Sequence, residues 1–190
     1  EPPKGKLRSG SRCGCGSGKT FGDCCKAKPD HLRPAWDQMS IRERNRALFR
    51  GIENILELRP DADWTNVRRT ITDEKISKIY SVYEALWPLE TDLLTLLPKP
   101  DGTSRAVYTG MLHPSKIAEA ALGSSLLFDE ILVQHPFVNA RAMNEKFSPV
   151  KHPQAYRQEV LKCILMMFQL MPLIDVGLVN LFPDPWDFDY

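Results

Sequence analysis

Four of the five cysteines in this 190-residue chain lie within thirteen residues near its amino end. They form two short pairs, Cys13 with Cys15 and Cys24 with Cys25, joined by an eight-residue loop. Zinc prefers four soft, deprotonated ligands in a tetrahedron, with each sulfur at about 2.3 Å. Glycines at positions 14, 16, 18 and 22 would let the backbone turn sharply around such an ion. The spacing therefore predicts a structural Zn²⁺ site that uses all four thiolates.

Other interpretations of this segment are less favoured. Gly18-Lys19-Thr20 looks like the end of a phosphate-binding P-loop, but Cys13 stands where the first glycine should be and no strand-like run precedes it. Disulfides would suit a small secreted scaffold without a core, whereas this chain is 43% hydrophobic and its cysteines are not spread through it. His31 is a further candidate zinc ligand, although a plain linker position explains it as well.

The pattern C-x-C-x8-C-C with a Gly-Ser-Gly-Lys centre resembles the SEC-C zinc motif, best known from the C-terminal tail of the SecA translocation ATPase. The resemblance covers roughly Arg12 to Lys26. It implies that the four cysteines are the ligands, with Cys25 in a place that other members give to His. In that family the motif is a structural zinc knuckle used for docking on proteins or on the ribosome. The resemblance thus implies a protein or nucleoprotein partner.

Charge is balanced over the whole chain and basic at its amino end. A formal net charge of +1 argues against a broadly electrostatic partner. Residues 1–28, however, carry seven Lys or Arg side chains and two acidic ones. With four thiolates and one Zn²⁺ included, about three positive charges remain. This tip suits an acidic protein surface or phosphate, so nucleic acid stays open as a second class of partner.

The segment after the cysteines is expected to be helical. Ser40 and Glu43 form a capping box before a helix that should run to about Leu58, stopped by Pro60. A polar connection is expected over residues 61–71, and a second helix over 72–87. Residues 93–97 suit a helix or a strand. An arginine row at positions 42, 46 and 50 would lie along the core edge or contact phosphate.

Beyond residue 99 the pattern alternates between strands and helices. Strands are expected at 105–109, 130–134 and 178–182, with helices at 114–127 and 153–171. This order implies right-handed crossovers and a small, mostly parallel sheet. The fold class predicted is therefore α+β or α/β, divided into a zinc knuckle (1–30), a helical segment (35–98) and an α/β segment (99–190). The last segment resembles α/β domains of bacterial proteins, a resemblance that implies no activity.

Functional crevices in open parallel sheets lie outside the carboxyl ends of the strands. The candidates there are His113 after the first strand, His135 after the second, and Asp184 with Asp187 after the third. Two histidines and two carboxylates could hold a metal or perform acid–base chemistry. Most of them lie beside a proline, where capping and turn-forming residues are common, and this simpler interpretation is favoured.

Three functional hypotheses follow from these residues. The leading one is a structural-zinc protein whose knuckle docks on another protein or a nucleoprotein. The alternatives are a hydrolase with its site at His113, His135 and Asp184, and a nucleic-acid binder that uses the basic knuckle and the arginine row. The lone Cys163 lies in the phase of an apolar helix, where packing is expected.

Location and length complete the expectations. The sequence contains no run of eighteen apolar residues, so we expect no membrane span. Zinc-bound reduced thiols point to the cytoplasm. The chain begins with Glu1 and ends on an aromatic segment with nothing after it to pack against, so we expect the full protein to continue. The sequence indicates no oligomeric state.

Overall fold

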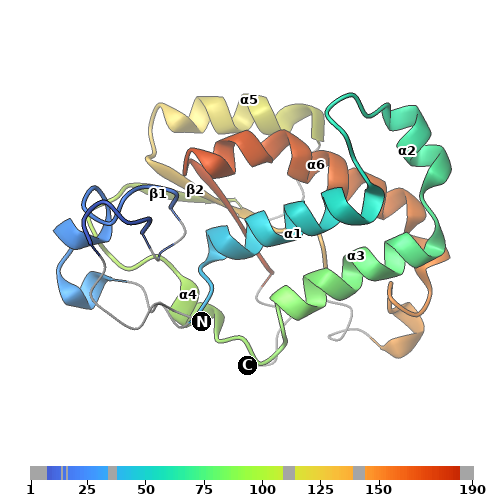
Figure 1. Ribbon diagram of the computed structural model, residues 1–190, viewed down its shortest axis with the longest axis horizontal. Coiled ribbons are helices and arrows are strands. Elements are labelled where there is room, and N and C mark those ends of the chain that lie inside the picture. Colours follow the sequence, from blue (N-terminus) through green and yellow to red (C-terminus); the bar gives the residue numbers. More distant parts are fainter. Residues whose placement is uncertain are drawn as a thin grey trace.

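The computed structural model of the protein describes residues 8–13, 15, 17–33, 38–108, 114–138 and 144–184. Its described part contains a small cysteine-rich unit, then helices, then a three-stranded parallel sheet with helices between the strands, which confirms the predicted mixed α/β class. The cysteine-rich unit and the short helix α4 (Leu93–Leu96) lie at the same end of the molecule (Figure 1). Among the described helices, none has the length and apolar character needed to cross a membrane.

The helices begin at side-chain caps that the sequence predicts in part. Helix α1 (Ile41–Leu56) starts with the predicted capping box, in which Ser40 and Glu43 bond to each other's backbone N–H groups. Helix α3 (Asp73–Leu86) starts at Thr72 as expected. The polar connection predicted at 61–71 is wrong, because α2 (Trp64–Thr70) forms there under an Asp63 cap. Because α2 has only seven residues and one buried side chain, Val67, the sequence shows no apolar periodicity that would predict it.

The sheet is parallel throughout, with the strand order β1-β2-β3. Strands β1 (Arg105–Tyr108), β2 (Glu130–Gln134) and β3 (Val179–Phe182) agree with the predicted segments to within one residue at each end. Helix α5 (Pro114–Ser125) connects β1 to β2, and α6 (Arg157–Asp175) connects β2 to β3. The two helices pack side by side (Figure 1). Tyr108 hydrogen-bonds to Ser124, which places α5 over the face that carries Tyr108.

The two faces of the sheet differ in chemistry. Register partners share a face, so Tyr108, Val133 and Leu181 lie on the side of α5 and belong to the hydrophobic core. The opposite face begins with Arg105 and Glu130, and Asn180, whose register partner is Leu132, lies two residues further along. These polar side chains, called the polar face below, therefore lie near the amino ends of the strands.

Helix α6 is as long as predicted but lies four residues further along the chain. It is preceded by a 3₁₀ turn at Pro153–Tyr156 and continues through Pro172 to Asp175, four residues beyond the predicted end at Met171. Pro172 removes one backbone hydrogen bond of the helix. It is tolerated because it lies in the last turn, so little of the helix is disturbed. Gly177, at φ +86°, then turns the chain into β3.

One hydrophobic core joins the helical and the α/β segments. Most of its buried side chains come from α1, α3, α6, β2 and β3, or from residues next to them, and include Leu48, Tyr83, Trp87, Val133 and Ile164, while β1 adds the partly buried Tyr108. The cysteine-rich unit has a separate small cluster made of Cys13, Phe21 and Cys25. The proposed boundaries at 30 and 98 stay predictions, although the shared core spans the second of them.

Candidate metal centre

The cysteine-rich unit folds as a narrow hairpin followed by a turn of helix. Arg12 pairs with Thr20 in an isolated antiparallel bridge, and the N–H of Cys13 donates to the carbonyl of Lys19 at 2.9 Å. Gly18 makes the turn between them at φ +75°, a conformation that glycine adopts without strain. The chain then returns through Phe21 to a 3₁₀ turn at Cys25–Ala27. This path brings the two cysteine pairs face to face.

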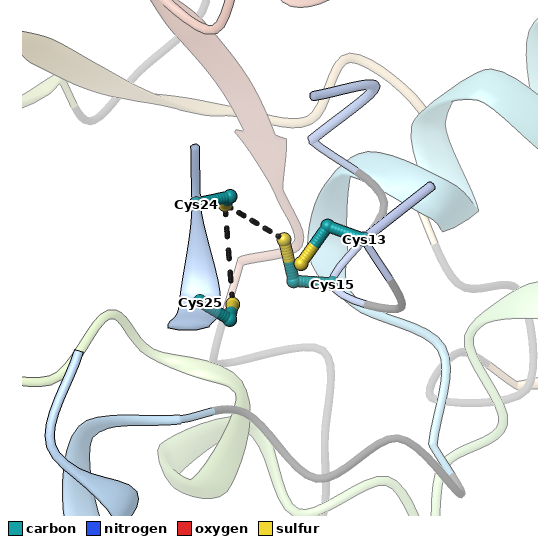
Figure 2. A group of neighbouring side chains, drawn as sticks. All are labelled: Cys13, Cys15, Cys24 and Cys25. Atoms are coloured by element: carbon teal, nitrogen blue, oxygen red, sulfur yellow. Dashed lines mark hydrogen bonds between the residues drawn. The ribbon is translucent and has the colours of Figure 1, made fainter. Parts of the chain in front are cut away.

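The four sulfur atoms converge on one point (Figure 2). One ligand atom from each of Cys13, Cys15, Cys24 and Cys25 lies within 4.8 Å of all the others. The Sγ–Sγ distance is 3.5 Å from Cys15 to Cys24 and 3.9 Å from Cys24 to Cys25. A tetrahedral zinc–thiolate centre with bonds of about 2.3 Å has sulfur–sulfur edges of about 3.8 Å. The observed spacing could therefore hold a metal ion, and Zn²⁺ fits its size and donor type.

The electrostatics of the thiols also suit a bound cation. Burial raises the pKa of Cys24 and of Cys25, and the neighbouring cysteines raise both further. Burial also opposes ionisation of Cys15, but hydrogen bonds from the side chain and backbone of Ser17 and from Cys13 and Cys24 together outweigh it and lower its pKa to about 7. The Cys15 thiolate thus forms readily near neutral pH, while Cys24 and Cys25 need a cation to stabilise their charge.

Two residues outside the ligand set hold the unit together. The hydroxyl of Ser17 lies 3.2 Å from the Cys24 sulfur, within hydrogen-bond distance. Arg33 donates from Nε to the carbonyls of Cys25 and Lys28, both at 3.0 Å, and from a terminal nitrogen to the carbonyl of Lys26. Sequence reasoning missed both residues. The serine in the Gly-Ser-Gly-Lys centre was a signal for the first, whereas nothing in the sequence pointed to Arg33.

A chain of ion pairs connects this unit to the sheet. Lys28 pairs with Asp101 at 3.2 Å, and Arg105 at the start of β1 binds both oxygens of the same carboxylate. Arg105 also pairs with Glu130 at the start of β2 at 2.5 Å. The Arg105 guanidinium, despite the burial of Asp101, holds the pKa of that carboxyl well below its usual range. The knuckle therefore lies against the amino ends of the strands.

The residues predicted at the carboxyl ends of the strands do not form a comparable cluster within the described ranges. His113 and Asp187 lie outside the described residues. Asp184 accepts a hydrogen bond from Gln134 at 2.8 Å. His135 is fully buried, and its Nδ1 accepts from the N–H of Phe137 at 3.1 Å. In the part of the chain that the structure describes, the four cysteines are the group of His, Cys, Asp or Glu side chains close enough to share one ion.

The structure also shows the contacts of three other candidates from the sequence: His31, the arginine row and Cys163. His31 is exposed and is not part of the cysteine cluster. In the arginine row, Arg42 contacts the carbonyl of Gly177 and Arg46 pairs with Asp175 at 3.1 Å, while Arg50 is exposed. Cys163 is buried and donates to the carbonyl of Pro136, and burial raises its pKa to about 12. Two of the three arginines are thus engaged within the molecule.

Comparisons with known proteins identify no relative. No protein-family model, no curated protein and no solved structure matches this chain.

Proposed function

We propose that this protein binds one structural Zn²⁺ through Cys13, Cys15, Cys24 and Cys25 in a SEC-C-like knuckle, and that the knuckle docks on another protein or a nucleoprotein. The convergence of the four sulfurs supports this most directly. Further support comes from the small size of the unit, whose own buried cluster holds only three of the described side chains. A module with so little core depends on metal binding for its folding energy.

A structural role is favoured over a catalytic role for this ion. Catalytic zinc sites keep one coordination position open for water or substrate, whereas four thiolates fill the tetrahedron. With all four positions filled, the ion has no place for a reacting oxygen. The basic residues around the knuckle then provide the recognition surface, and the ion stabilises the loop that presents them.

Metal analysis of the purified chain tests the zinc assignment. Protein prepared without chelators should contain one zinc per chain by inductively coupled plasma mass spectrometry. Cys13→Ser and Cys24→Ser should each lose most of it, because three thiolates bind zinc more weakly than four. Cys163→Ser is the matched control, since this buried thiol lies outside the cluster, and it should keep full zinc content. Zinc-free wild-type protein would contradict the proposal.

Docking is tested by comparing partners with and without the ion. Affinity capture with zinc-loaded wild-type protein should recover proteins that Cys13→Ser fails to recover. An Asp184→Asn variant should still recover them, because the docking surface lies at the other end of the strands. Equal recovery by wild type and Cys13→Ser would show that the zinc site has no role in docking.

A further inference from the structure

A cleft of about 610 Å³ separates the metal centre from the polar face of the sheet. One wall contains Cys15 and Cys24, and the facing wall contains Arg105, Glu130 and Asn180 at the amino ends of the strands. The leucines of α4 form a third side, and Figure 1 shows α4 at the same end of the molecule as the knuckle. The sequence predicted a crevice at the carboxyl ends of the strands, so this cleft was not anticipated.

Two buried polar atoms of opposite kind belong to residues that line the cleft. The Nε–H of Arg42 and the Oδ1 of Asn180 have no hydrogen-bond partner within the described part of the chain. Asn180 is 4% exposed, and its amide nitrogen is held by Glu130. An unpaired buried donor or acceptor costs about 1–3 kcal/mol, so proteins rarely leave such atoms without a partner. A peptide backbone carries both a carbonyl acceptor and an N–H donor, so it offers a partner to each atom.

The charges in the cleft leave two cations without an acidic partner. Three carboxylates line the cleft: Asp101 is held by Lys28 and Arg105, Glu130 is held by Arg105 and Asn180, and Asp129 accepts from the backbone N–H of Ser104. Arg42 and Lys99 make hydrogen bonds only to backbone carbonyls among the described residues. A carboxylate on a ligand could supply the acidic partner that these two cations lack among the described residues. Because four zinc-bound thiolates would add two negative charges to the opposite wall, that carboxylate should lie near Arg42 and Lys99.

The third side of the cleft is apolar and accessible. Leu94 is 68% exposed, whereas Leu93, which precedes it and begins the short helix α4, is buried. Leu32, Leu96 and Leu97 are partly exposed and line the same space. Aliphatic side chains placed beside unpaired cations suit a ligand that carries both an apolar group and a negative charge.

We propose that this cleft binds an extended peptide segment of a partner protein, with an acidic residue next to an aliphatic one. Its backbone carbonyl and N–H groups would pair with Arg42 Nε and Asn180 Oδ1, its carboxylate with Arg42 and Lys99, and its aliphatic side chain with the leucines of α4. This inference rests on the proposed docking function and assigns the surface that performs it. The metal centre shapes one wall, so docking and zinc binding are physically linked.

Selection from a random dodecapeptide library displayed on phage, with the zinc-loaded full chain as bait, tests the site. Enriched sequences should share an Asp or Glu beside Leu, Ile or Val. A synthetic copy of the best sequence should bind Arg42→Met at least tenfold more weakly than wild type, because a charge-assisted hydrogen bond is lost. Arg46→Met is the matched control, since Arg46 lies one turn away and pairs with Asp175, and it should bind within about twofold of wild type.

A second variant and a zinc measurement separate the possible failures. Asn180→Leu should keep its zinc but lose the peptide; because it also removes the hydrogen bond from Asn180 to Glu130, its fold is checked by circular dichroism before binding is measured. Enriched peptides without acidic residues, equal binding by Arg42→Met, or displacement of the peptide by a twelve-nucleotide single strand would each overturn the peptide site. A chain without zinc would instead contradict the proposed function itself.

Discussion

The hydroxyl of Ser17 is placed to set the affinity of the metal centre. It lies within hydrogen-bond distance of the Cys24 sulfur, and hydrogen bonds from Ser17 lower the pKa of Cys15. Groups that hydrogen-bond to metal ligands orient those ligands and typically change metal affinity tenfold to a hundredfold. Ser17→Ala should therefore weaken zinc binding about tenfold, measured by competition with a chromophoric chelator. Ser11→Ala, in the same unit, should bind zinc as wild type does, and equal affinities for all three proteins would contradict this role.

His135 should make the folded protein sensitive to mild acid. Burial lowers its pKa from 6.5 to about 3, so below pH 6.5 the unfolded chain binds a proton that the folded chain does not. The neutral side chain's contribution to stability is fully present above pH 6.5 and is lost as the pH falls toward 3. Between pH 7.5 and pH 5 the free energy of unfolding should fall by about 2 kcal/mol from this residue.

Urea unfolding at several pH values measures this dependence. His135→Asn is the informative comparison, because an Asn side chain can still accept from the N–H two residues on but does not titrate. It should be less stable than wild type at pH 7 and should lose less stability between pH 7.5 and pH 5. Asp101 does not interfere in this range, because its pKa is lowered from an already acidic value. Parallel pH profiles for the two proteins would exclude His135 as the cause.

At the scale of elements, α1 closes the free edge of β3 with one side chain. The amide of Asn45 donates to the carbonyl of Leu181 at 2.9 Å and accepts from the N–H of Leu181 at 2.8 Å, as a neighbouring strand would. Asn45 is fully buried. Asn45→Ala should lower the free energy of unfolding by about 2–4 kcal/mol, because both backbone groups lose their partner. The exposed Asn54→Ala on the same helix should change it by less than about 0.5 kcal/mol.

These elements also show what the sequence could and could not predict. Apolar periodicity and the Ser40–Glu43 box predicted α1, because both depend on residues close in the chain. The role of Asn45 could not be predicted, since its partner lies 136 residues away. The cysteine cluster was accessible to sequence reasoning because its four members are local. The cleft was not, because its walls come from the knuckle, α1, α4 and the strand starts, which only the tertiary fold brings together.

The whole molecule should respond to zinc removal in two parts. The small cluster around Phe21 is separate from the main core, and the described ties between the two units are mostly polar. Chelation should therefore increase amide hydrogen exchange over about the first thirty residues, while α1, α3, α6 and the sheet stay protected. Hydrogen-exchange mass spectrometry with and without chelator measures this. Loss of protection across α3 and α6 would show that the knuckle and the body fold as one unit.

Arg33 gives the segment after the last cysteine an unusual stiffness. One guanidinium gathers the carbonyls of Cys25, Lys26 and Lys28, while Lys99 holds the carbonyl of His31 from the other side. These hydrogen bonds fix the orientation of this connecting segment as well as its length. A macromolecule that binds the cysteine-rich unit would consequently hold the rest of the protein in one fixed orientation.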